Sequence, residues 1–139
     1  MILNPGLEVH INNVKQNLSK ILDNNLEIKI NVYDSAHQYI FYYGGSIEID
    51  IWLHEATNKL HYASYTTLTV PTLFISIIRI TPSRQGLGST VLNEFINFSK
   101  VIGIGRISAV AENSFSENFF KKNGFIKQNV NNVYSIEIL

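Results

Sequence analysis

Cysteine is absent from this chain of 139 residues, which excludes disulfides, zinc–thiolate sites and a cysteine nucleophile. Charged residues of one sign do not cluster in the sequence either. Eleven basic and eleven acidic residues balance, and no basic cluster is longer than Lys121-Lys122. Proteins that bind nucleic acid or an anionic membrane usually carry a basic patch. We therefore expect neither of these as the main partner.

Long apolar runs and a basic N-terminal segment are missing as well. No stretch approaches the roughly 20 apolar residues that cross a bilayer. The first lysine is Lys15, so we expect no secretory signal and a cytoplasmic location. The four histidines show no His-x-x-x-His spacing, and we expect no metal site. With 45% hydrophobic residues, the chain is expected to form one domain over residues 1–139.

Hydrophobic periodicity predicts helices and strands along the whole chain. We expect a turn region at 33–38 and a hairpin at Gly44-Gly45. The expected elements, in chain order, are a helix at 7–22, strands at 26–32, 39–43, 46–53, 59–68 and 73–80, a helix from Ser89, a strand at 106–111, a helix from Ser114 and a strand at 133–139. This order predicts an α/β (α+β) three-layer domain, with a central mixed sheet and helices on both faces.

A glycine turn joins the apolar strand at 73–80 to the following helix. Gly86 and Gly88 lack Cβ atoms where the backbone turns sharply and a ligand can approach closely. The first amides of the helix have no intrahelical partner, and the helix dipole is positive there. A junction of this kind is typical of phosphate sites. No lysine follows either glycine, as a P-loop requires, and Val91 stands where a dinucleotide-binding loop has its third glycine.

A second pattern follows the strand at 106–111. Its sequence is Asn113-Ser114-Phe115-Ser116-Glu117-Asn118-Phe119-Phe120-Lys121-Lys122-Asn123-Gly124-Phe125. Ser114 and Glu117 have capping-box spacing, which predicts the start of a short helix. Gly124 suits the C′ position at its end, with two lysines in the last turn.

Together the two patterns resemble motifs A and B of the GNAT acetyltransferase superfamily, in the family's order. The resemblance covers Leu73 to Phe125 and leaves the first 70 residues without a motif. It implies a GNAT-like domain with acetyl-CoA as co-substrate, transferring an acyl group to the amine of an unidentified acceptor; a homodimer is one assembly to test for. The family usually has two helices between its first two strands, and here they are absent or reduced to the leading helix.

The resemblance also implies roles for particular residues. A backbone amide of the central strand, at Ile78 or at Ile80, would polarise the thioester carbonyl. Asn113 would hydrogen-bond the pantetheine arm. Arg84 either reaches the phosphates or is a solvated surface residue, in which case backbone amides hold them. The residues implied to bind the co-substrate are Ile80, Arg84, Gln85, Gly86, Leu87, Gly88, Ser89, Asn113, Phe119 and Phe120.

Two departures from the family pattern bear on catalysis. Phe120 stands where the family has a tyrosine that is thought to protonate the leaving thiolate, and Tyr134 is the nearest hydroxyl that sequence order allows. Ile77 or Arg79 stands where the family often has a glutamate base. Residues weighed as substitutes are Glu48, Asp50 and His61, each of which also reads as an ordinary strand residue. The alternatives are an acyl-CoA-binding module without turnover and a phosphate-binding protein of another fold.

The aromatic residues of the early strands are also ambiguous. They would line an acceptor groove, or they are present because aromatic residues form strands well. These residues are Tyr39, Tyr42, Tyr43, Trp52, Tyr62 and Tyr65.

Overall fold

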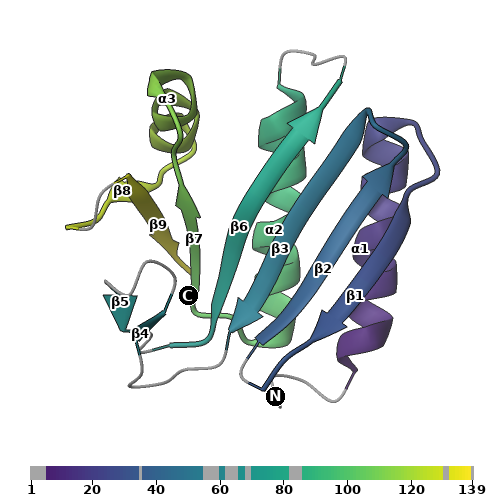
Figure 1. The fold of residues 1–139 in the computed structure, drawn as a ribbon, viewed down its shortest axis with the longest axis horizontal. Coiled ribbons are helices and arrows are strands. Elements are labelled where there is room, and N and C mark those ends of the chain that lie inside the picture. The colour runs from purple at the N-terminus through teal and green to yellow at the C-terminus, as the bar shows by residue number, and fades with distance from the viewer. Residues whose placement is uncertain are drawn as a thin grey trace.

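The structure, a computed structural model, describes residues 6–34, 36–54, 60–61, 66–67, 70–81, 86–129 and 132–138. Figure 1 shows helices packed against a twisted sheet. The elements are α1 (Leu7–Leu22), β1 (Glu27–Val32), β2 (Ala36–Tyr43), β3 (Ile47–His54), β4 (Leu60–His61), β5 (Thr66–Thr67), β6 (Thr72–Ile80), α2 (Leu87–Ile102), β7 (Arg106–Val110), α3 (Ser114–Lys122), β8 (Ile126–Lys127) and β9 (Val133–Glu137).

The main sheet has seven strands in the order β1-β2-β3-β6-β7-β9-β8. Its neighbours pair antiparallel, except that β6 and β7 are parallel. Helix α2 makes the crossover between these two strands, as a parallel pair requires. The mixed sheet and the α/β class that the sequence predicts are confirmed.

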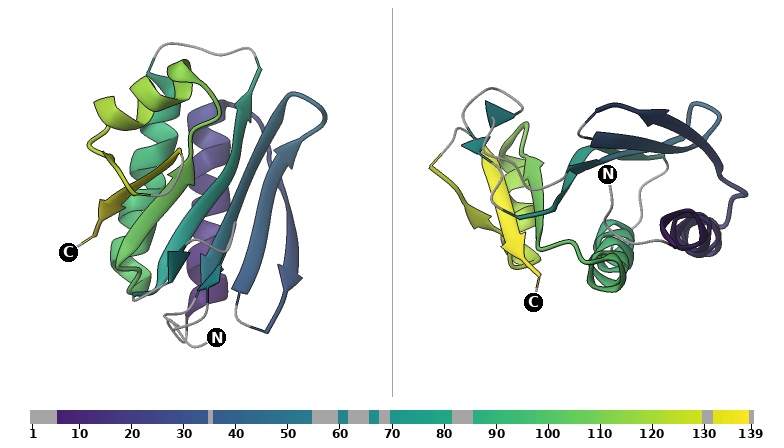
Figure 2. Two further views of the ribbon diagram at one scale, coloured as in Figure 1. Left: turned by 60° about the vertical axis from the view of Figure 1, so that its left-hand side comes forward. Right: turned by 90° about the horizontal axis from the view of Figure 1, so that it is seen from below.

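Helices α1 and α2 lie side by side under one face of the sheet (Figure 2). This face is apolar because alternate strand residues point to it. On β3 they are Ile47, Ile49, Ile51 and Leu53, each at most 2% exposed. Helix α1 presents a matching stripe of Leu7, Ile11, Val14, Leu18 and Leu22. Fully burying one such aliphatic side chain contributes roughly 1.5–3 kcal/mol, so this layer holds the fold together.

Helix α3 packs on the same face, which differs from the expected helices on both faces. Tyr134 of β9 pairs with Ala109, and Ala109 pairs with Ile75, so all three point to the α1 and α2 side. The ring of Phe120 on α3 stacks on Tyr134, with ring centroids 6.2 Å apart. The opposite face carries the polar residues Gln38 and Asp50, and among the described residues no helix covers it.

The element boundaries show where local geometry overrode the sequence pattern. The turn after β1 closes when the Tyr33 amide donates to the Ala36 carbonyl at 2.9 Å, so β2 begins earlier than expected. Helix α2 begins at Leu87 rather than Ser89, because Gly86 takes a left-handed conformation with φ of 82° and completes the turn. The single strand expected at 59–68 was wrong: β4 and β5 lie there and pair with each other. The remaining expected elements are confirmed within one or two residues, and the last strand ends at Glu137.

Candidate functional site

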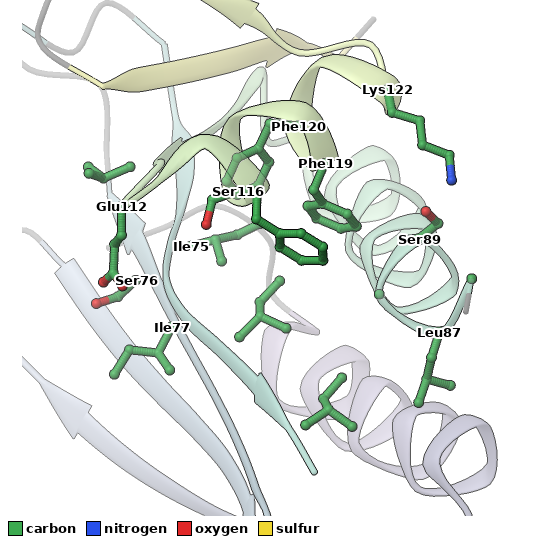
Figure 3. Close-up of a pocket in the computed structure, with 16 residues that line it drawn as sticks. Ile75, Ser76, Ile77, Leu87, Ser89, Glu112, Ser116, Phe119, Phe120 and Lys122 are labelled. Atoms are coloured by element: carbon green, nitrogen blue, oxygen red, sulfur yellow. The ribbon is translucent and has the colours of Figure 1, made fainter. Parts of the chain in front are cut away.

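A cleft opens where β6 and β7 part. Their parallel pairing ends at Ile75 and Ala109, while β6 continues to Ile80. Helices α2 and α3 close the sides of the space that results, which has a volume of about 580 Å³ (Figure 3). It is lined by Ile75, Ser76, Ile77, Ile78, Ile80, Gly86, Leu87, Gly88, Ser89, Val110, Glu112, Phe115, Ser116, Phe119, Phe120 and Lys122.

A β-bulge coincides with the point of separation. Ile51 of β3 pairs with Ile75, while the next pair outward is Asp50 with Ile77, so Ser76 is an extra residue in β6. A bulge bends its strand and increases the local twist. We infer that Ser76 turns the rest of β6 away from β7 and so makes room for a ligand between them.

The amides of Ile78 and Ile80 face the cleft side of β6. The Thr81 amide donates to the Ser46 carbonyl at 2.7 Å, so it points toward β3. Amide direction alternates along an antiparallel strand, which turns the amides of Ile80 and Ile78 the other way. Since both side chains also line the cleft, the structure leaves the two sequence candidates equivalent.

The N-terminus of α2 reaches the cleft, and no described group accepts a hydrogen bond from its first amides. Among the described residues no side chain caps it, and its first turn contains no acidic residue. Leu87, Gly88 and Ser89 all line the cleft. Their amides have no intrahelical acceptor, and the helix dipole adds positive potential, so this end suits an anion. Gly86 and Gly88 thus lie where the sequence placed them.

Gly88 has a second role that the sequence did not show. A Cβ atom built there would lie 3.0 Å from a ring carbon of Phe119. Such a contact is tighter than nine in ten real Cβ contacts, so a side chain at Gly88 would require the Phe119 ring to shift by a few tenths of an ångström. The glycine therefore permits close packing of the two helices as well as close approach by a ligand.

Two charged side chains lie at opposite ends of the cleft (Figure 3). Lys122 lies with Ser89 at the start of α2, where it adds positive charge to the anion site. Glu112 lies with Ser76 at the bulge. Sequence reasoning noted Lys122 as one of the two lysines in the last turn of the helix, and it missed Glu112. The signal that was available is a carboxylate directly after the buried residues of β7 and Ala111.

The N-terminus of α3 is capped from within the chain. The Asn113 side-chain oxygen accepts from the Ser116 amide at 2.9 Å and from the Ser116 hydroxyl at 3.1 Å. Asn113 is thus the N-cap, and the capping box expected from Ser114 was wrong by one residue. Asn113 is not among the residues that line the cleft. Its implied bond to a pantetheine arm stays a prediction, and the structure commits its oxygen to the helix.

The aromatic residues of motif B form one cluster. Phe119 and Phe120 line the cleft, with ring centroids 5.3 Å apart. Tyr134 lies behind Phe120, is 0% exposed and does not line the cleft. Its hydroxyl is buried and has no hydrogen-bond partner in the described part of the chain. The predicted acid role of Tyr134 thus requires the Phe120 ring to move aside.

The remaining sequence candidates are not brought into the cleft. Glu48 forms an ion pair with Arg79, and Asp50 accepts from Gln38, both on the face without helices. Arg84 and Gln85 lie outside the described residues, as do Tyr62 and Tyr65. Of His61 only the backbone is described. Within the described ranges, no group of three or more potential ligands is placed to hold a metal, and no helix is long and apolar enough to span a membrane.

Solved structures resemble this fold, although no family model and no curated protein matches the sequence. A structure of a mutant AtaT toxin bound to the C-terminus of the antitoxin AtaR superimposes with a TM-score of 0.54 at 17% identity, over 83% of this chain and 93% of that chain. The mutant toxin bound to the antitoxin C-terminus and acetyl-CoA gives a TM-score of 0.52 at 17% identity, over 83% and 94%. A putative GNAT-family acetyltransferase from Desulfovibrio desulfuricans gives 0.50 at 16% identity, over 76% and 70%.

The chain therefore has the fold of the GNAT acetyltransferases, which confirms the resemblance inferred from its two motifs. Among the similar structures, one AtaT–AtaR complex and the KacTA complex are bound to DNA. These likenesses lie at 16% or 17% identity and show the fold alone.

Proposed function

We propose that this protein is an N-acetyltransferase that transfers an acetyl group from acetyl-CoA to an amine acceptor. One observation carries the proposal. The uncapped N-terminus of α2 and the unpaired edge of β6 open into the same cleft, so a single elongated ligand can contact both. Acetyl-CoA has this form, with phosphates at one end and an amide-containing arm that ends in a thioester. The acetyl-CoA-bound structure of a protein with this fold supports the choice.

The phosphate end fits the residues at the start of α2. The amides of Leu87, Gly88 and Ser89 would donate to the pyrophosphate, with Lys122 as the neighbouring cation. No acidic residue in the first helical turn opposes that binding. The rings of Phe119 and Phe120 form an apolar wall for the arm of the ligand between the two ends of the cleft.

The thioester end fits the edge of β6. Beyond Ile75 the strand has no β7 partner, so its amides and carbonyls on that side are available to the amides of the pantetheine arm. An extended ligand would pair with this edge as an added strand does. The amide of Ile78 or of Ile80 would then donate to the thioester carbonyl and stabilise the oxyanion that forms on attack.

Glu112 is the side chain placed to accept the proton of the acceptor. An alkylamine with a pKa of about 10.4 is mostly protonated at neutral pH and cannot attack in that form. Glu112 would take this proton directly or through a water molecule, and the neutral amine would attack the thioester carbon. The C–N bond forms, the C–S bond breaks, and the CoA thiolate leaves with the electron pair.

At the position where the family has a tyrosine, Phe120 lacks a hydroxyl and offers no proton to the leaving thiolate. A thiolate with a pKa of about 8.5 leaves without assistance and takes a proton from water. A positioned acid contributes about 10²- to 10⁴-fold, so turnover should be slower than an added donor would allow. Tyr134 remains the alternative donor, reached only if the Phe120 ring rotates.

We propose two partners for this chain, acetyl-CoA and an amine acceptor. Complexes of AtaT–AtaR and of KacTA are bound to DNA, but we do not propose DNA as a partner of this chain. The reason is that the charges of this chain balance and no basic cluster is longer than Lys121-Lys122.

The proposal is tested by thiol release from acetyl-CoA with a panel of primary amines. Glu112→Gln should lower kcat by about 10²-fold or more, with the Kd for acetyl-CoA unchanged. Glu117→Gln is the matched control, since Glu117 lies in the first turn of α3 without lining the cleft. Equal losses in the two variants would contradict the role of Glu112. Acetyl-CoA binding without thiol release from any amine would favour a binding module over an enzyme.

A further inference from the structure

A chain of hydrogen bonds crosses the face of the sheet that no described helix covers. The Asn31 side chain donates to the Gln38 oxygen at 2.9 Å. The Gln38 nitrogen donates in turn to both carboxylate oxygens of Asp50, at 3.2 Å and 3.0 Å. Gln38 is thereby fixed in orientation, with its oxygen accepting and its nitrogen donating. The chain runs from β1 through β2 to β3 and ends on the carboxylate.

The Asp50 carboxylate is buried, and no cation in the described part of the chain pairs with it. Its residue is 6% exposed, because the facing residues on the neighbouring strands are Ile40 and Ile77. The nearby guanidinium of Arg79 is paired with Glu48. A carboxylate accepts about four hydrogen bonds, and among the described side chains only Gln38 donates to it. A buried carboxylate without a paired cation lowers the stability of the fold. We therefore look for a function that explains why an aspartate occupies this position.

The position of Asp50 supplies that reason. Asp50 pairs with Ile77, next to the bulge residue Ser76, and so lies level with the point where β6 leaves β7. Ile77 and Ser76 both line the cleft, as does Val110. Ile77 and Val110 point to the same face as Asp50, according to the strand pairing. The cleft therefore reaches this face at Ile77, the residue that pairs with Asp50, although Asp50 itself does not line the cleft.

We propose that Asp50 binds the ammonium group of the acceptor, where the hydrogen-bond chain across the sheet meets the opening between β6 and β7. This inference rests on the proposed function and specifies its substrate class: a primary amine that arrives protonated, on an apolar body. An ammonium group offers three donors to the unused acceptor sites of the carboxylate. The side chains of Ile40, Ile77 and Trp52 beside it favour an apolar substituent.

The effect of the buried Asp50 carboxylate on the stability of the fold can be measured. Burial raises the pKa of Asp50, the bond from Gln38 lowers it less, and the charge of Glu48 also raises it. The folded protein thus binds the Asp50 proton more tightly than the unfolded chain does. The group stabilises the fold when it is protonated at low pH, and that contribution is lost as pH rises through its raised pKa. Asp50→Asn should therefore raise Tm at pH 7, with a smaller gain near pH 4.

The test uses 2-phenylethylamine as the probe and the uncharged 2-phenylethanol as its match, in titrations followed by amide and side-chain NMR without acetyl-CoA. The amine should shift the signals of Asp50, Ile77 and the Gln38 side chain, and the alcohol should not. Asp50→Asn should weaken amine binding at least tenfold. Glu48→Gln should change it less than twofold, because the Glu48 charge is already paired with Arg79.

Equal binding of amine and alcohol, or equal affinity in the wild type and Asp50→Asn, would overturn the assignment. An Asp50→Asn protein with the raised Tm predicted above and normal acetyl-CoA binding shows that any loss of amine affinity is local to the amine site. Because the titration contains no acetyl-CoA, it also separates two failures. Amine binding without thiol release contradicts the proposed function alone, and thiol release without amine binding at Asp50 contradicts this inference alone.

Discussion

The N-termini of α2 and α3 face the same cleft but are built in opposite ways. At α2, Gly86 turns the chain, no described side chain caps the helix, and the first turn has no acidic residue. At α3, the Asn113 oxygen binds the Ser116 amide, and Glu117 supplies a negative charge in the first turn. One helix leaves its positive end available to a ligand, while the other satisfies its own.

This difference favours motif A over motif B as the phosphate site that we propose. An orphan helix amide that faces a cleft needs an acceptor, and at α2 the described chain supplies none through a side chain. At α3 the cap already contributes roughly 0.5–2 kcal/mol to stability, and a ligand there would have to compete with it. We therefore propose motif A as the anion site, with motif B supplying a wall of the same cleft through Phe119 and Lys122.

Ser89→Asp should have the largest effect of these substitutions, because it places a negative charge at the uncapped N-terminus of α2. The new carboxylate sits in the first turn of α2, where it stabilises the helix by about 0.3–1 kcal/mol. It also repels phosphates, so the affinity for acetyl-CoA should fall at least tenfold, or about 1.4 kcal/mol. Calorimetric titration and thermal unfolding on one sample should show weaker binding together with a higher Tm.

Ser114→Asp is the matched control on α3. Ser114 lies in the first turn of that helix, is exposed and does not line the cleft. Its aspartate should give a similar gain in Tm and leave acetyl-CoA affinity within about twofold of the wild type. If both variants lost affinity alike, the phosphates would not distinguish the two helix ends.

Asn113→Ala tests the capped end. Loss of the bonds to Ser116 should cost about 1 kcal/mol of unfolding free energy, with the Kd for acetyl-CoA nearly unchanged. Urea unfolding and calorimetry measure the two quantities. Weaker acetyl-CoA binding at unchanged stability would instead support the pantetheine bond that the GNAT resemblance implies for Asn113.

The smallest expected effect is a difference in acetyl-CoA affinity between Lys122→Gln and Lys121→Gln. Both lysines lie in the last turn of α3, where they interact with the helix dipole to a similar extent, but Lys122 alone of the two lines the cleft. Lys122→Gln should weaken acetyl-CoA binding about threefold at low salt, with a smaller effect at high salt. A loss of the same size in Lys121→Gln would indicate a general charge effect.

The sequence predicted the elements that depend on local patterns. Apolar spacing located α1 at Leu7–Leu22, and Gly86 and Gly88 indicated the turn into α2 where we propose the anion site. The face taken by α3 was not predictable, because it depends on which residues of β9, β7 and β6 pair, and pairing register is a property of the whole sheet.

The remaining site residues were hidden for a related reason. Glu112 looks like any exposed residue after a strand until the separation of β6 and β7 places it beside Ser76. Asp50 alternates like a solvent-facing strand residue, and only the pairing with Ile40 and Ile77 shows that it is buried. Contacts between strands distant in sequence decide both cases, and periodicity within one strand does not report them.

The most direct test of the central claim is an amide NMR titration of the wild-type protein with acetyl-CoA, compared with a small acetyl thioester that lacks phosphates. We predict that acetyl-CoA shifts the amides of Leu87, Gly88 and Ser89 most, while the Ser116 amide keeps its protection from hydrogen exchange. The phosphate-free thioester should leave those α2 amides unchanged. Binding of acetyl-CoA with unshifted α2 amides, or with its largest effects at the Asn113 cap, would contradict the account.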